Sequence, residues 1–117
     1  MQTLADGVVC RGRVPAASAF ASAERRVPVV VALELAAQAA AVHGALAGDG
    51  ASPGGHGALV SVRSAVLHAA EIEAGSPLVA TARRVAAAGP LATYEVVVEA
   101  AGGQAILTAT IGTHRGP

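Results

Sequence analysis

One stretch, residues 27–48, constrains the fold more than any other: it reads VPVVVALELAAQAAAVHGALAG. Pro28 suits a first helical position, where its missing N–H costs nothing, and Gly48 suits the position just past a helix end. Alanine and leucine fill the middle of the stretch, and both are strong helix formers. The sequence therefore predicts a helix from about residue 28 to residue 47.

Three polar residues interrupt this helix: Glu34, Gln38 and His43. No face of the helix is polar throughout, and a helix that is apolar all round is expected to be buried. A buried carboxylate is costly unless it is paired or its pKa shifts, so Glu34 most needs an explanation. Gln38 lies four residues on, on the same face, where it can orient the Glu34 carboxyl. His43 falls on the opposite side, and we expect it to be half-exposed near the negative end of the helix dipole.

The composition limits the class of protein. The chain has 117 residues, the size of one domain, and we treat residues 1–117 as that domain. It is 53% hydrophobic but only 2% aromatic, which predicts a thin core and favours dimerisation. A formal net charge of zero and the absence of lysine argue against a nucleic-acid partner. Charged and polar residues in the predicted helix argue against a membrane span.

The single cysteine, Cys10, is expected to be a small buried residue, since it can form neither an internal disulfide nor a metal cluster. No signal peptide is recognisable at the start of the chain, because the first residues lack a basic region and an apolar run. Nothing in the sequence implies an oxidising compartment. These features predict a cytoplasmic location.

Strand-forming residues precede and follow the predicted helix. Turn residues rich in glycine and proline separate them, which is typical of an antiparallel meander. In the strand at 58–67, Val60, Val62 and Val66 are expected on one face. The predicted strands are 7–14 before the helix and 58–67, 78–85, 92–100 and 105–113 after it. Such a sheet can bury an apolar helix only by curling about it, with a second subunit covering the remainder.

The order of these residues resembles a known family. Pro28 followed by Glu34 and Gln38 in ALELAAQ resembles the core helix of hot-dog 3-hydroxyacyl-[acyl-carrier-protein] dehydratases. The segments VSVRSA at 60–65 and GSPL at 75–78 resemble the family's later strands. The nearest likeness is to the divergent dehydratase-like subunits of polyene and aryl-polyene pathways. The resemblance implies an α+β hot-dog fold in which a curved antiparallel sheet wraps a central helix in a dimer.

The resemblance also implies a chemistry, the loss of water from a 3-hydroxyacyl thioester. In this family a histidine removes the α-proton, and a carboxyl from the other subunit protonates the departing hydroxyl. Glu34 would be that acid, its pKa raised by an apolar tunnel, with Gln38 orienting it. No metal and no cofactor are implied beyond the phosphopantetheine of an acyl carrier protein that bears the substrate.

The expected histidine is missing from this chain. The family places it eight or nine residues before the helix-opening proline, and those positions are Phe20 and Ala19. Four histidines occur later, and none has the family position: they are His43, His56, His68 and His114. A homodimer would therefore have the acids without the bases. We expect a heterodimer with a second hot-dog subunit that carries the histidine, with a homodimer as the alternative.

A basic pair, Arg25 and Arg26, precedes the helix. It can steer an acidic carrier protein to the site, or it can be a solvated pair neutralised by Glu24. Two other functions stay open. The chain can be a hot-dog acyl-CoA or acyl-carrier-protein thioesterase that uses Glu34 as base or nucleophile, or a non-enzymatic scaffold or acyl-chain binder in which Glu34 is structural.

Overall fold

The computed structural model describes residues 1–14, 26–47, 59–100 and 102–114. Strands precede and follow one helix that opens with a short 3₁₀ turn, η1. In chain order the elements are β1 (Gln2–Leu4), β2 (Gly7–Arg13), β3 (Arg26–Pro28), η1 (Val29–Val31), α1 (Ala32–Ala47), β4 (Leu59–Leu67), β5 (Glu71–Glu73), β6 (Pro77–Ala88), β7 (Leu91–Glu99) and β8 (Ala105–His114).

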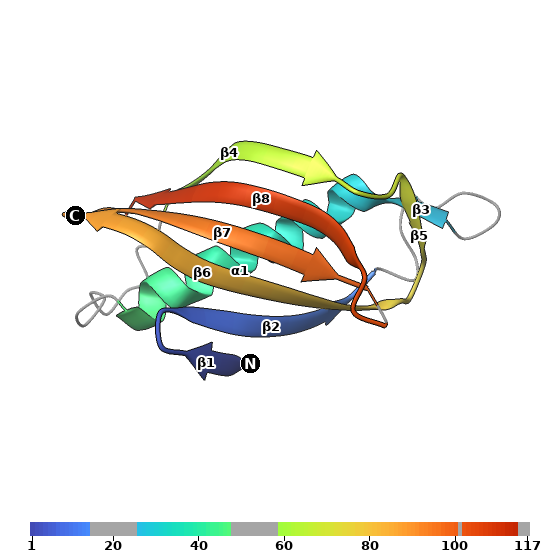
Figure 1. Cartoon of the computed structure of the whole chain (residues 1–117), viewed down its shortest axis with the longest axis horizontal. Coiled ribbons are helices and arrows are strands. Elements are labelled where there is room, and N and C mark those ends of the chain that lie inside the picture. Colours follow the sequence, from blue (N-terminus) through green and yellow to red (C-terminus); the bar gives the residue numbers. More distant parts are fainter. Residues whose placement is uncertain (15–25, 48–58, 101, 115–117) are drawn as a thin grey trace.

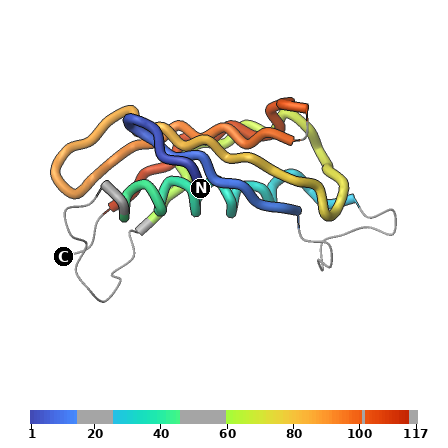
Figure 2. Tube along the Cα trace, turned by 90° about the horizontal axis from the view of Figure 1, so that it is seen from below, coloured from blue at the N-terminus to red at the C-terminus, as the bar shows by residue number. Residues whose placement is uncertain are grey.

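Six of the strands form one antiparallel sheet in the order β1-β2-β6-β7-β8-β4. The helix α1 runs obliquely across one face of this curved sheet (Figure 1), and Figure 2 shows the two layers edge-on. The predicted strand at 7–14 and the four predicted strands after the helix are confirmed, and all five join this sheet. This is the α+β hot-dog architecture expected from the sequence.

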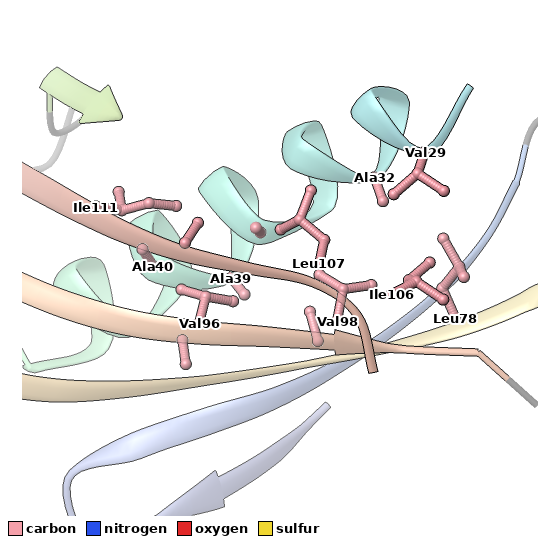
Figure 3. Packing of buried hydrophobic residues seen from close by; sticks show 14 of the residues in the cluster. Val29, Ala32, Ala39, Ala40, Leu78, Val96, Val98, Ile106, Leu107 and Ile111 are labelled. Atoms are coloured by element: carbon pink, nitrogen blue, oxygen red, sulfur yellow. The ribbon is translucent and has the colours of Figure 1, made fainter. Parts of the chain in front are cut away.

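Alanines make the contact between helix and sheet. Ala36, Ala39 and Ala40 are fully buried at 0% exposure. Figure 3 shows Ala39 and Ala40 facing branched side chains of β7 and β8 such as Val96 and Leu107. Since alanine is both a strong helix former and small, this face lets the helix lie close to the sheet. Tight packing replaces the large side chains that the composition lacks.

Glycine-containing turns join the long strands as expected. The β6–β7 hairpin turns at Gly89, whose φ is 59°, and Gly102 and Gly103 after β7 have φ of 88° and 81°. Residues with a Cβ rarely adopt these values, so glycine is needed at these positions. Along β7 the buried side chains of Tyr94, Val96 and Val98 alternate with less buried ones, as Glu95 is exposed.

The helix begins later than predicted. Pro28 ends the short strand β3 with extended backbone angles, φ −57° and ψ 136°, and only then does the 3₁₀ turn η1 begin. The α-helix proper starts at Ala32. The three valines that follow Pro28 are β-branched, and such residues lose rotamer freedom in a helix. The prediction of a first helical position for Pro28 is therefore wrong by one turn.

In the single chain the helix is buried on one side only, against the sheet. The expectation that a second subunit covers the remainder stays a prediction. The side turned away from the sheet carries Glu34 and Gln38, and both are exposed. Val30, just before the helix, is 51% exposed on this chain.

Strand β4 is an open edge of the sheet and is poorly covered. Every side chain of residues 60–67 is exposed, including Val60, Val62, Val66 and Leu67. A β-bulge at Arg63 shifts the register with β8. Beyond the bulge Val66 lies opposite Thr108, on the other face from Val62, so the prediction that the three valines share a face is wrong.

Three strands of three residues each were not predicted. β1 pairs with β2, while β3 and β5 form a small separate sheet near the start of the helix. The amide of Val29 donates to the carbonyl of Ala70 at 2.9 Å, which attaches the helix start to the segment before β5. Segments this short carry no periodic pattern that a sequence reading could use.

A buried hydrogen bond fastens the other end of the helix to the sheet. The Nδ1 atom of His43 lies 2.6 Å from the Tyr94 hydroxyl, and the two rings meet edge to face. His43 is only 7% exposed, so the prediction of a half-exposed residue is wrong. Burial lowers the pKa of His43, the nearby Arg84 charge lowers it further, and Asp6 opposes the change. Burial raises the pKa of Tyr94, which keeps its hydroxyl protonated as a donor.

Replacing Tyr94 by Phe should destabilise the fold. The substitution keeps the ring but leaves the buried Nδ1 of His43 without a partner, at an expected cost of about 1–3 kcal/mol in the free energy of unfolding. Chemical denaturation measures this change. His68→Ala is the control, because its 3.1 Å bond to Thr108 is exposed, and it should cost less than about 0.5 kcal/mol. Equal losses in both variants would contradict the role of the buried bond.

His43 should also make stability depend on pH. Because its folded pKa is lowered, the unfolded chain binds a proton at the ordinary value of 6.5 while the folded chain stays neutral. Stability is therefore complete above pH 6.5 and falls as the pH drops below it. Chemical denaturation at about pH 7.5 and at about pH 5.5 gives the free energy of unfolding at each pH. The difference between the two values should be smaller for His43→Gln than for the wild type. His68→Gln should keep the wild-type difference.

Candidate functional site

The helix face turned away from the sheet carries the predicted pair of Glu34, a carboxylate, and Gln38, an amide. Gln38 Nε2 donates a hydrogen bond to Glu34 Oε1 at 3.4 Å, one helical turn away. The prediction that these two residues share a face is confirmed. The bond is long and exposed, so it orients the Glu34 carboxylate without holding it rigidly. The other oxygen, Oε2, stays available to a ligand.

A cavity of about 360 Å³ lies beside this pair, between the first half of the helix and the C-terminal end of β2. The lining is mostly apolar, with Glu34, Gln38 and two arginines as its charged or polar members. From the helix side come Val31, Ala32, Glu34, Leu35 and Gln38, and from the sheet come Arg11, Gly12, Arg13, Val14 and Leu78. Its size falls within the range of small-molecule pockets.

Gly12 sets the distance between helix and strand at this cavity. A Cβ atom built on Gly12 would lie 3.3 Å from both methyl carbons of Leu35, closer than most such contacts. Gly12 therefore faces the helix, and its neighbours Arg11 and Arg13 belong to the opposite face of β2. A larger residue at position 12 would push Leu35 into the cavity.

The two arginines stand at the rim of the cavity. Arg13 Nη1 donates to the carbonyl of Gly75 at 3.2 Å, and in the described part of the chain no carboxylate pairs with either guanidinium. Arg11 also borders a hollow on the outer side of the sheet, near Val79 and Glu99. The sequence analysis missed these two residues, although their alternation about Gly12 is visible in the sequence.

The predicted docking pair is placed only in part. Arg25 lies outside the described residues. Arg26 is exposed, and its Nη2 donates to the carbonyl of Glu71 at 3.2 Å. Its strand register sets it opposite one acidic residue, Glu73. The docking role of this pair stays a prediction.

The described histidines do not approach Glu34. His43 is buried against Tyr94, His68 bonds Thr108, and His114 is exposed at the end of β8, while His56 lies outside the described residues. None of the three lines the cavity. Within the described ranges, then, the cavity has one carboxylate and no imidazole. Such an arrangement can give or take a proton at one point, and a two-group acid–base reaction needs a second group from elsewhere.

The described residues include neither a candidate metal site nor a helix that could span a membrane. No group of three or more His, Cys, Asp or Glu side chains is arranged to hold a metal ion. No described helix is both long and apolar enough to cross a membrane. Cys10 is half-buried in β2, opposite Ala80, rather than fully buried as predicted.

Solved structures share this architecture at low sequence identity. The dehydratase heterocomplex ApeI:P from Xenorhabdus doucetiae matches with a TM-score of 0.73 at 16% identity, over 100% of this chain and 80% of the other. The PaaI protein of the E. coli phenylacetic acid degradation operon gives 0.72 at 18% identity, over 97% and 79%. The fluoroacetyl-CoA thioesterase FlK gives 0.72 at 16% identity, over 97% and 88%. Likeness at these identities shows the hot-dog fold alone.

Sequence comparison identifies the family. No curated protein matches this chain significantly. A family model described as ApeP-like, ApeP dehydratase, matches residues 1–116. The match spans the helix, the cavity and every described strand, and it agrees with the resemblance in the helix motif. The chain therefore belongs to the ApeP-like dehydratase family.

Proposed function

We propose that this chain is the half of a heterodimeric dehydratase that lacks the catalytic histidine, and that Glu34 supplies the acid that protonates the leaving hydroxyl. One observation carries the proposal. Glu34 stands exposed beside an apolar cavity, on the helix face turned away from its own sheet, and no described histidine lines that cavity. Family membership supports the reaction class, and the lone carboxylate supports a shared site.

A second hot-dog chain with a histidine before its own helix would complete the site. Two uncovered surfaces favour such a partner: the outward face of α1 and the open edge of β4 with its exposed valines. The likeness to the dehydratase heterocomplex ApeI:P supports the same arrangement. A partner strand laid along β4 would continue the sheet and satisfy the free main-chain groups of that edge. The apolar surroundings expected for an acidic Glu34 would come from this partner.

The proposed reaction removes water from a 3-hydroxyacyl thioester. The partner's imidazole takes the proton from the α-carbon, and the electrons of that C–H bond form the double bond to the β-carbon. The β-hydroxyl leaves with the proton of the Glu34 carboxyl, as water. The imidazolium and the Glu34 carboxylate then exchange a proton through solvent, which restores both groups. Gln38 acts through its bond to Glu34 Oε1, leaving Oε2 to carry the proton.

The substrate in this proposal is carried on the phosphopantetheine of an acyl carrier protein, in polyketide, polyene or fatty acid biosynthesis. We propose that the complex meets it in the cytoplasm. The chain would then work in an assembly of three proteins: this subunit, its histidine-bearing partner and the carrier. A homodimer remains the alternative to the heterodimer, and it would have to work without the family's base.

The absence of a described histidine beside Glu34 also favours a second candidate. A carboxylate without an imidazole can activate water toward a thioester, or attack it directly, as the base or nucleophile of a thioesterase. This reaction releases a free thiol, which the dehydratase does not. A non-enzymatic acyl-chain binder is the third candidate, and it needs the cavity but no chemistry at Glu34.

Glu34→Gln should abolish most of the dehydratase activity of the assembled complex. The substitution keeps the size of the side chain but removes the transferable proton, so kcat should fall about 100-fold or more. Formation of the enoyl thioester by mass spectrometry measures this. Glu95→Gln is the matched control, since Glu95 is an exposed carboxylate on the sheet face opposite the helix, and it should keep wild-type kcat.

The same assay separates the candidates. Free thiol released by the wild type and lost in Glu34→Gln would assign the thioesterase instead. Unchanged product formation in Glu34→Gln would contradict both enzymatic roles and favour the acyl-chain binder. Full dehydratase activity from this chain purified alone would contradict the need for a partner.

Val62→Asp should weaken the proposed heterodimer. Val62 is 45% exposed on the open strand β4, where a charge would be buried by the partner. Native mass spectrometry of the co-expressed chains should show a large loss of the 1:1 complex. Val85→Asp is the control, because Val85 is similarly exposed at 53% but lies on β6, away from β4. Equal effects of the two substitutions would contradict β4 as the interface.

A further inference from the structure

We propose that the open edge of β2 at Arg11 and Arg13 binds the phosphopantetheine arm that delivers the thioester to Glu34. The main chain of these two residues would bond the amides of the arm, and their guanidinium groups would hold its phosphate. This inference rests on the proposed function, because it names how the substrate of that site is held.

Within the part of the chain that the structure describes, the strand register leaves the main chain of Arg11 and Arg13 without partners. The amide of Arg84 donates to the carbonyl of Asp6, and the amide of Val14 donates to the carbonyl of Ser76, so residues 6 and 14 bond toward β6. Bonding direction alternates along an antiparallel strand, so the other even-numbered residues of β2 also bond to β6. The N–H and C=O groups of the odd-numbered residues therefore point to the other side.

On that other side β1 covers only part of the edge. It pairs with Gly7 and Val9 of β2 and reaches no further, since its first residue, Gln2, lies opposite Val9. No described strand pairs with the edge at Arg11 and Arg13. Two N–H groups and two C=O groups, roughly 6.7 Å apart along the strand, are left free to bond an extended ligand.

The free edge borders the Glu34 cavity. The end of β2 and Val14 just after it form one wall of the cavity, and the helix with Glu34 and Gln38 forms the other. Leu35 and Leu78 supply an apolar surface between the two walls. A chain that enters along the strand edge therefore reaches the carboxylate through an apolar passage.

The charges at the rim favour an anion at the outer end of such a chain. Arg11 and Arg13 have no carboxylate partner among the described residues. By contrast, Arg26 at the predicted docking site bonds the carbonyl of Glu71 and lies opposite Glu73. Apart from the bond of Arg13 to the carbonyl of Gly75, no described residue occupies the guanidinium groups of Arg11 and Arg13, so these groups can take up an anion at the cavity rim.

Phosphopantetheine combines the three features that this surface would recognise. It has a phosphate at one end, two amides in the middle and a thiol that carries the acyl group at the other end. Guanidinium groups bind phosphate through paired, charge-assisted hydrogen bonds, and amides can add to an open strand edge as a further strand does. The same arm occurs in acyl carrier proteins and in coenzyme A, so either source can present it.

Binding measurements on the complex with its partner test the phosphate contact. For coenzyme A and for a phosphopantetheine-loaded carrier, Arg11→Ala and Arg13→Ala should each raise the Kd about tenfold or more. Arg83→Ala is the matched control, an exposed arginine of β6 that does not line the cavity, and it should leave the Kd unchanged. With pantetheine, which lacks the phosphate, the arginine substitutions should have much less effect. Binding of the carrier alone, or of coenzyme A alone, would identify the source of the arm.

Arg13→Pro tests the main-chain contact separately. Proline removes the N–H at a position where that group points away from the sheet, which an edge strand tolerates, and the preceding Gly12 accepts the restriction that proline imposes. Arg13→Pro should bind the arm roughly threefold to tenfold more weakly than Arg13→Ala, as expected for one lost hydrogen bond. Thermal unfolding confirms that both variants remain folded.

Three results would overturn the inference. The first is an unchanged Kd in both Arg11→Ala and Arg13→Ala, and the second is an equal loss of affinity in Arg83→Ala. The third is an equal affinity of Arg13→Pro and Arg13→Ala, which would contradict the main-chain contact. Failure of the proposed dehydratase would look different. In that case the arm would still bind through Arg11 and Arg13, while the Glu34→Gln variant would make the same product as the wild type.

Discussion

The close contact between the alanine face of α1 and the sheet governs the rest of the structure. Ala36, Ala39 and Ala40 are fully buried, so at these three positions the helix presents only methyl groups to the sheet. This contact fixes the rotation of the helix about its axis, and successive helical residues are about 100° apart. Because the alanines face the sheet, Glu34 must face away from it. The position of the carboxylate is thus a consequence of packing.

The small side chains of this core also leave apolar surface of the chain exposed. Alanine buries little apolar area, so the interior gains less from the hydrophobic effect than a leucine-rich core would. Apolar surface that other folds keep inside is exposed here along β4 and beside the helix start. One partner that covers β4 and the outward helix face would bury this surface and enclose Glu34. Assembly and chemistry would then depend on the same contact.

The sequence predicted the elements with strong periodicity and missed what depends on tertiary placement. The helix and the long strands follow from alternation and from turn glycines. His43 lies seven residues after Ala36, on the same helix face. Its burial can therefore be predicted only when it is known that this face packs on the sheet. The outward position of Glu34 requires the same knowledge. The placement of Arg11 and Arg13 depends on where β1 ends, and no local pattern reveals which strand edge is left open.

The bulge at Arg63 has a consequence for recognition. A regular edge strand can be paired in several alignments that differ by two residues, because each shift returns the same side chains to the same face. In β4 the extra residue reverses the two faces midway, so Val62 and Val66 project to opposite sides. A neighbouring strand can match this reversal in one alignment only. The bulge therefore favours pairing in a single register and disfavours strands in other registers, even when they are equally apolar.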